Sequence, residues 1–341
     1  MPRPLVSPNI LITAASRRVP LVRAFQQALT GTGQGGRVVV TDVNPLSPAV
    51  YAADRAFRVP FASDPSYIDT VLAIALAEGI GLVVPTIDDE LPVFGRALDR
   101  FAGHGIRVAV SSPDTTELCN DKYGTCRTLA AHGIDAASSW LAGELPADLP
   151  FPLFIKPRRG RGSIGAHAVR NQRELDFFLD YASDPVVQGY LDGPEFTIDL
   201  LCDFSGRPVS VVPRRREVIR AGVIDRGCTV RDQRLIDLAL ACAGVLPLVG
   251  AVNIQCRMVD GRPVVFEINP RFSGGIPLTI AAGADFPRML IDLARGRTVR
   301  PAIGRFRDRL WMTSFETSIF VDEAQIVLPA HQPAAAVEAV A

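Results

Sequence analysis

The sequence predicts an α/β protein in which a parallel sheet with covering helices is followed by an α+β region. Short apolar runs alternate with helical patterns over the first 110 residues, which is typical of right-handed βαβ units on a parallel sheet. Beyond Gly133, strand-like runs follow one another with few helical patterns between them, which indicates a different architecture. A chain of 341 residues, 48% of them hydrophobic, suffices for roughly two to three packed domains.

The elements of the first part follow the apolar pattern. Strands are expected at 9–13, 37–41, 82–86 and 106–110, and helices at 19–29, 67–78 and 91–101. The turn after the first strand lacks the G-x-G-x-x-G pattern, so we expect no dinucleotide site there. Ser112 and Pro113 begin a short helix, and Asn120 or Asp121 caps a second one that ends at Gly133.

The second part reads as strands with an antiparallel hairpin near its end. Strands are expected at 151–156, 165–170, 186–190, 195–202 and 208–213, a hairpin at 250–258 and 263–268, and helices at 231–245 and 277–295. We therefore divide the chain into an N-terminal domain (1–112), a small subdomain with linker helices (113–190), a large subdomain (191–325) and a mobile tail (326–341).

Composition excludes several classes of partner. Thirty-six basic residues balance 36 acidic ones, so no surplus charge would gather nucleic acid or anionic lipid. No apolar run reaches the about 18 residues of a membrane span, and the N-terminus lacks a signal-peptide layout. Six cysteines without a C-x-x-C pair favour reduced thiols. We expect a cytoplasmic protein that acts on small molecules, with a homodimer left open.

Lysine is used at two positions only, Lys122 and Lys156, whereas arginine supplies the other basic residues. Chance is one explanation; the other is that both places need a compact point charge that a planar guanidinium cannot replace. Lys122 lies in the first turn of its helix, where a cation opposes the helix dipole. A bound anion would explain it. We expect arginine to replace Lys156 poorly, and Lys122 better, because a helix end offers more room.

A glycine loop follows the strand that carries Lys156. Residues 160–165, with Gly160, Gly162, Ser163 and Gly165, fit G-x-G-x-x-G, but a strand follows instead of a helix, which excludes the dinucleotide fold. Strand, glycine loop and strand instead form a flap whose backbone N–H groups can close over a triphosphate. A plain glycine hairpin is the alternative.

The segment from Gln188 to Glu195 joins two strands. Its main chain can read adenine through N–H and C=O groups, and Glu195 can accept hydrogen bonds from two ribose hydroxyls. A surface turn with a solvated glutamate is the alternative.

The last hairpin carries oxygen ligands on one face. Glu267 and Asn269 are two apart on a strand and share a face. A three-residue loop at 259–261 would place Asn253 opposite Glu267, with Gln255 diagonal to it. One carboxylate with amide carbonyls suits Mg²⁺ bound together with phosphate oxygens and water.

Charged residues near these motifs are candidates for the acid and amine substrates. Arg271 follows the last hairpin. Arg216 and Arg220 lie between the segment 188–195 and that hairpin, and the guanidinium fork of an arginine there suits a substrate carboxylate. A solvated arginine run is the alternative. Asp88 and Glu90 follow the third expected strand, at the edge where parallel sheets bind ligands. They could meet an amine, or an acid of this run could cap the next helix.

Together these motifs resemble the ATP-grasp superfamily over residues 8–300, with the greatest similarity to its carbamoyl-phosphate-synthase-like branch, which includes the pyrrolysine-biosynthesis ligase. The motifs are Asn120-Asp121-Lys122, Phe154-Ile155-Lys156-Pro157, the glycine flap, Gln188 with Gly193-Pro194-Glu195, Asn253-Ile254-Gln255 and Glu267-Ile268-Asn269-Pro270-Arg271. The resemblance implies an N-terminal parallel domain and two α+β subdomains that clasp ATP.

The resemblance also implies residue roles. Lys122 and Lys156 would contact the nucleotide phosphates, 189–191 would form the adenine hinge and Glu195 would hold the ribose. Gln255, Glu267 and Asn269 would hold Mg²⁺, or Mn²⁺ in its place, and Arg271 would touch the transferred phosphate. Gly189 stands where many relatives carry an acidic residue.

By the same resemblance we expect an ATP-dependent ligase that forms an acyl phosphate from a carboxylate for attack by an amine or a thiol. A carboxyphosphate-forming or kinase-like enzyme, and a non-catalytic nucleotide-binding subunit, are the alternatives. A complete carbamoyl phosphate synthetase, which carries two such modules, is not expected.

Overall fold

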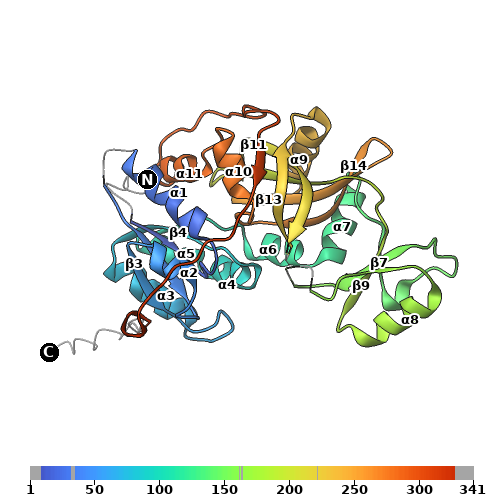
Figure 1. The fold of residues 1–341 in the computed structure, drawn as a ribbon, viewed down its shortest axis with the longest axis horizontal. Helices are drawn as coiled ribbons and strands as arrows, with labels where there is room; N and C mark the ends of the chain where they lie inside the picture. Colours follow the sequence, from blue (N-terminus) through green and yellow to red (C-terminus); the bar gives the residue numbers. More distant parts are fainter. Residues whose placement is uncertain (1–8, 32–34, 161, 163, 221, 327–341) are drawn as a thin grey trace.

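The computed structural model describes residues 9–31, 35–160, 162, 164–220 and 222–326. The tail predicted at 326–341 lies outside these residues except for its first position, and Ser163 of the glycine loop lies outside them too. Figure 1 shows the N-terminal domain at one end of the molecule, the strands β7 and β9 with α8 at the other, and the long strands β11, β13 and β14 between them.

The N-terminal domain is a parallel five-stranded sheet, in the order β3-β2-β1-β4-β5. Its strands are β1 (Asn9–Ile12), β2 (Val38–Asp42), β3 (Arg55–Arg58), β4 (Ile80–Val84) and β5 (Arg107–Val108). Its helical elements are α1 (Val19–Thr30), α2 (Pro48–Ala52), α3 (Tyr67–Ala77), η1 (Asp88–Glu90), α4 (Leu91–Arg96) and α5 (Leu98–Gly103). The central strands β2 and β4 are fully buried, and β1 is buried except at Asn9, which explains their apolar runs.

This sheet confirms the predicted class and corrects two of its elements. The edge strand β3 was not predicted, because of its four residues only Phe57 is buried. The single helix predicted at 91–101 is two short helices, α4 and α5. The strand order changes direction between β1 and β4, so the loops after these two strands form the crevice where open α/β sheets bind ligands.

The next part contains the linker helices α6 (Pro113–Asn120) and α7 (Lys122–Ala131) and a four-stranded sheet in the order β6-β9-β7-β8. Its elements are β6 (Ser139–Leu141), η2 (Ala142–Glu144), β7 (Leu153–Pro157), β8 (His167–Val169), α8 (Gln172–Tyr181) and β9 (Pro185–Gly189). The Asp121 side chain accepts from the Gly124 N–H and caps α7, one of the two predicted caps. Helix α8 was not predicted; it buries Leu175 alone.

The largest sheet has six strands in the order β14-β13-β10-β11-β12-β15. They are β10 (Glu195–Cys202), β11 (Pro208–Arg220), β12 (Val223–Thr229), β13 (Gly250–Val259), β14 (Arg262–Asn269) and β15 (Trp311–Thr313), joined by α9 (Gln233–Val245), α10 (Ile276–Ala281), α11 (Phe286–Ala294) and, beyond β15, η3 (Glu323–Gln325). Strand β11 continues well past Pro213, the expected end, because it pairs with β12 as far as Arg220. Among the described residues no helix combines the length and apolarity that a membrane crossing requires.

The register predicted for the last hairpin is wrong. The turn has two residues, Asp260 at φ +47° and Gly261 at φ +76°, as expected for a type I′ hairpin turn. A β-bulge beyond Cys256 then adds one residue to β14. Together they place Gln255, not Asn253, opposite Glu267.

Candidate active site

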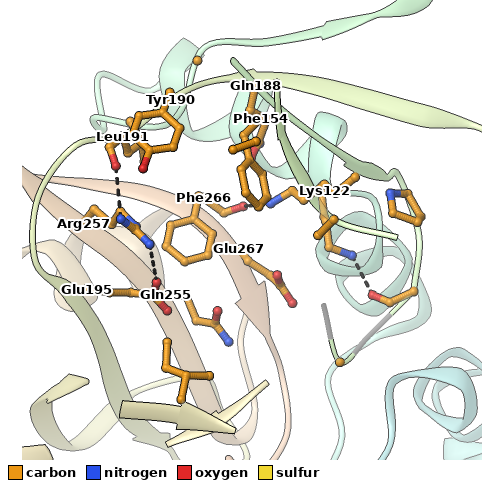
Figure 2. A pocket seen from close by; sticks show the side chains of 18 of the residues that line it. Lys122, Phe154, Gln188, Tyr190, Leu191, Glu195, Gln255, Arg257, Phe266 and Glu267 are labelled. Carbon is orange, nitrogen blue, oxygen red and sulfur yellow. Dashed lines mark hydrogen bonds and ion pairs between the residues drawn. The ribbon is translucent and has the colours of Figure 1, made fainter. Parts of the chain in front are cut away.

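A cavity of about 270 Å³ lies between the four-stranded and the six-stranded sheet. Figure 2 shows side chains from both sheets and from α7 pointing into it. The predicted site residues that line it are Lys122, Lys156, Gly160, Gly162, Gln188, Gly189, Tyr190, Leu191, Glu195, Arg216, Gln255 and Glu267. The predicted residues that do not line it are Gly165, Asn269, Arg271, Arg220, Asp88 and Glu90.

Both lysines point into this cavity from different elements. Lys156 lies on β7 and is 5% exposed; its Nζ donates to the Phe266 carbonyl at 3.3 Å and lies 5.2 Å from the centre of the Phe266 ring. Lys122 is the first residue of α7 and is 7% exposed; its Nζ donates to the Gly160 carbonyl at 2.6 Å. Within the described part of the chain neither ammonium forms an ion pair with a carboxylate. Two buried cations that are held by carbonyls and an aromatic ring, with no carboxylate partner among the described residues, favour an anionic ligand.

The glycine loop joins two antiparallel strands, with Ile155 of β7 opposite His167 of β8. This strand–loop–strand order is the one that the sequence predicted. The start of the loop is fastened to α7, because Arg158 donates to both oxygens of Asp121, and its carbonyl accepts from the Lys122 N–H at 3.1 Å. These contacts therefore hold the start of the glycine loop against the capped N-terminal end of α7.

The hinge is anchored on the small subdomain. The Gln188 amide donates to Ser139 Oγ at 2.9 Å and to Cys126 Sγ at 3.3 Å. The Gly189 N–H donates to the Ser138 carbonyl at 2.9 Å. The Gly189 N–H is therefore used within the small subdomain and does not donate into the cavity.

Two arginines hold Glu195. Arg216 Nη1 lies 2.6 Å and Arg257 Nη2 lies 2.8 Å from its carboxylate oxygens. Arg257 also donates to the carbonyls of Leu191 and Gly193, each at 3.3 Å, which ties the hinge to the large sheet (Figure 2). Sequence reasoning missed Arg257, although its spacing of two from Gln255 puts both on one face.

Two aromatic walls were also missed. Phe154 lies two residues before Lys156 on β7, and Phe266 directly precedes Glu267; both line the cavity. Adjacent residues of a regular strand face opposite sides. The β-bulge in β14 breaks this alternation and turns Phe266 and Glu267 toward the same cavity.

The predicted metal ligands are partly brought together. Gln255 and Glu267 face each other across β13 and β14 and line the cavity. Asn269 is 5% exposed; its side chain donates to Asn253 Oδ1 at 3.4 Å and accepts from Arg271 Nη2 at 3.3 Å. In the described residues no three His, Cys, Asp or Glu side chains gather around one point. One carboxylate with amide oxygens fits Mg²⁺, which shares its coordination with phosphate and water.

The structure places the predicted acidic residues after β4, Asp88 and Glu90, outside the lining of the cavity. Glu90 is fully buried and accepts from Tyr67 Oη at 2.7 Å and from the Thr86 N–H at 2.6 Å, so it cannot meet a substrate amine, and burial raises its pKa. Asp88 forms an ion pair with Arg271 at 2.8 Å and does not cap α4, whose N-terminus has no side-chain cap.

The arginine run on β11 alternates between buried and exposed positions. Arg214 is 1% exposed and ion-paired with Asp199 at 2.7 Å. Arg216 lies beside Glu195 and Gln255. Arg220 is exposed and pairs with Glu316 at 3.4 Å; it does not line the cavity, although its neighbour Ile219 does, and its substrate role stays a prediction.

Two family models match the chain. The model described as "ATP-grasp in the biosynthetic pathway with Ter operon" matches residues 182–317, which include the face formed by Glu195, Gln255 and Glu267. The chain carries an ATP-grasp domain. The model "PylC-like, N-terminal domain" matches residues 10–109, the parallel sheet that precedes the ATP-grasp domain.

Known proteins resemble the chain along most of its length. It is 24% identical over 335 residues to the carbamoyl phosphate synthase large chain of Deinococcus deserti, covering 91% of this chain and 31% of that protein. An L-amino acid ligase from Bacillus licheniformis shares the fold at a TM-score of 0.68 and 18% identity, covering 86% of this chain and 78% of that one. The biotin carboxylase domain of a Hydrogenobacter thermophilus 2-oxoglutarate carboxylase, solved with MgADP, ADP and bicarbonate, gives a TM-score of 0.69 at 17% identity, covering 89% and 73%. The chain spans about a third of the length of the curated relatives it matches.

We expect ATP binding to depend on pH through the buried ammonium of Lys156. Burial lowers the pKa of Lys156, Glu267 opposes that change and Lys122 adds to it. Triphosphate oxygens beside the ammonium would raise the pKa again. In the pH range between these two pKa values, ATP binding should therefore take up a proton, so affinity should fall as pH rises through that range and level off above it. Calorimetry in two alkaline buffers of different ionisation enthalpy measures this uptake; equal heats in both would contradict it.

Proposed function

We propose that the chain is an ATP-dependent ligase that activates a carboxylate as an acyl phosphate and joins it to an amine. The observation that carries the proposal is the cavity lined by two buried lysines, by Glu267 and Gln255, and by Gly160 and Gly162 of the glycine loop. Cations on one wall and oxygen ligands on the other suit a metal-bound triphosphate. The fold shared with an L-amino acid ligase supports it.

The residues would divide the work as follows. A substrate carboxylate oxygen attacks the γ-phosphorus of ATP and ADP leaves; the amine then attacks the acyl carbon and phosphate leaves. Lys122 and Lys156 would hold phosphate oxygens, and Glu195 the ribose. Glu267 and Gln255, with Asn269 behind them, would hold Mg²⁺, which when bound neutralises phosphate charge. Arg271 would contact the transferred phosphoryl group. Positioning and charge neutralisation supply most of the rate in such reactions.

Bicarbonate is a second candidate for the activated acid, because a structural neighbour was solved with bicarbonate and MgADP. In that case the intermediate is carboxyphosphate. The two candidates differ in the substrates that phosphate release from ATP requires.

The test is phosphate release from ATP and Mg²⁺ with single amino acids, with amino acids in pairs and with bicarbonate, followed by mass spectrometry of the products. We expect release that depends on an acid and an amine together, with one new amide per phosphate. Release with bicarbonate alone would support the second candidate. ATP binding without release under any combination would overturn both and indicate a nucleotide-binding subunit.

A further inference from the structure

The N-terminal domain meets Arg271 through the loop that follows β4. Asp88 Oδ2 accepts from Arg271 Nη2 at 2.8 Å and from Arg271 Nε at 3.2 Å. The two residues are 183 positions apart in the sequence, and both are largely buried, with side-chain exposures of 8% and 14%. A two-donor contact to a buried carboxylate fixes the guanidinium plane as well as its position.

The other contacts of this guanidinium lie on its own loop. Arg271 Nη1 donates to the Phe272 carbonyl at 3.3 Å, and Nη2 donates to Asn269 Oδ1 at 3.3 Å. These are the longer contacts. The chain of hydrogen bonds therefore runs from Asp88 through Arg271 to Asn269, and so from the N-terminal domain to the hairpin that carries the predicted metal ligands.

A second cation, Arg18, lies near Arg271, so the negative charge of Asp88 matters more here than it would in an isolated ion pair. Arg18, on the loop after β1, donates to the Thr86 carbonyl at 2.7 Å and to the Phe272 carbonyl at 3.0 Å, so it joins the same two loops. Burial and the neighbouring charge of Arg271 lower the pKa of Arg18 to about 9, whereas Asp88 and Glu90 raise it. Because Glu90 is occupied by Tyr67 and the Thr86 N–H, Asp88 is the carboxylate that faces Arg271.

We propose that Asp88 is a positioning residue, which holds Arg271 in the orientation that the transferred phosphoryl group requires. This inference rests on the proposed function, in which Arg271 contacts that group. Without the charge of Asp88, repulsion from Arg18 would move the guanidinium away from its place. The proposed ground-state contacts of ATP with the two lysines, and of Mg²⁺ with Glu267, would stay as they are. The effect should thus fall on turnover rather than on nucleotide affinity.

Asp88→Asn keeps the shape of the side chain and removes its charge. We expect kcat for ATP-dependent phosphate release to fall by about tenfold to thirtyfold, with KM for ATP within about twofold of the parent. Asp203→Asn is the matched control, since Asp203 is also a buried aspartate paired with an arginine, Arg207 at 3.0 Å, at the end of β10 away from Glu195. Asp203→Asn should change neither kcat nor KM for ATP. A kcat of Asp88→Asn within about twofold of the parent, or a loss confined to KM, would overturn the proposal.

A second measurement does not depend on activity. Phenylglyoxal modifies accessible arginines, and peptide mass spectrometry reports the rate for Arg271 by itself. We expect that rate to rise severalfold in Asp88→Asn and to stay at the parent value in Asp203→Asn. An unchanged rate in Asp88→Asn would overturn the positioning role. A parent protein without ATP turnover would overturn the proposed function and the catalytic meaning of the contact, while this rate still shows whether Asp88 holds Arg271.

Discussion

Glu267→Gln is expected to lower turnover by about a thousandfold or more while the fold stays intact. Glu267 lines the cavity opposite Gln255 and is the carboxylate of the proposed ligand set. Glutamine has the same shape and still offers one amide oxygen, but it lacks the negative charge that a divalent cation requires. The substitution also removes a negative charge that would repel the phosphates next to Lys156, so ATP should still bind. The measurement is phosphate release at saturating ATP across a range of Mg²⁺ concentrations, with melting temperature as the check on folding.

The matched control is Glu217→Gln on β11. Glu217 pairs with Arg215 at 2.7 Å on the exposed side of that strand and does not line the cavity. It should leave turnover unchanged. Activity of Glu267→Gln close to that of the parent at ordinary Mg²⁺ would remove the metal assignment, and recovery at high Mg²⁺ would support it.

Lys156→Arg is expected to weaken ATP binding by about 30-fold or more, which corresponds to roughly 2 kcal/mol or more. Lys156 is 5% exposed and its ammonium packs on the Phe266 ring, so a larger planar group has little space there. Arg226→Lys on β12, an exposed position, is the reverse exchange at a surface site and should change nothing. Calorimetry with ATP measures the affinities, and melting temperature without ATP should move little.

Lys122→Arg should also be harmful, contrary to the sequence-based expectation of more room. Lys122 is nearly as buried as Lys156, and its Nζ reaches the Gly160 carbonyl at 2.6 Å. A guanidinium there would displace the start of the flap. If both variants bind ATP as the parent does, the two lysines have no special place in nucleotide binding, and the proposed pose loses its support.

Much of the fold could be predicted because it depends on local patterns. Continuous apolar runs such as 38–40 are typical of central strands of a covered parallel sheet, and a glycine loop between two antiparallel strands was predicted from its flanking apolar runs. Elements with few buried residues escaped prediction. Strand β3 and helix α8 each bury a single side chain among charged neighbours, so their sequences resemble loops.

Only part of the candidate site could be predicted, because the rest depends on pairing and contacts between segments that are distant in the sequence. Lys122, Lys156 and Glu267 belong to short motifs, and one cavity gathers them. The register of the hairpin depends on a turn of two residues and a bulge, and a single residue of slip changes which side chains face each other. Arg257 acts through contacts with a hinge and a glutamate on other segments, which no local pattern announces.

The sequence alone determined the order of the elements, the change from a parallel to an antiparallel architecture and the residue types that a triphosphate site needs, because each depends on neighbours along the chain. The tertiary structure alone decided which charges face each other. The Asp88–Arg271 pair joins residues 183 positions apart, and Glu90, two residues after Asp88, is turned inward to Tyr67. Both are acids in one short run. Packing of the N-terminal domain against the large subdomain gives Asp88 its arginine, whereas packing within the N-terminal domain gives Glu90 the buried hydroxyl of Tyr67 on α3.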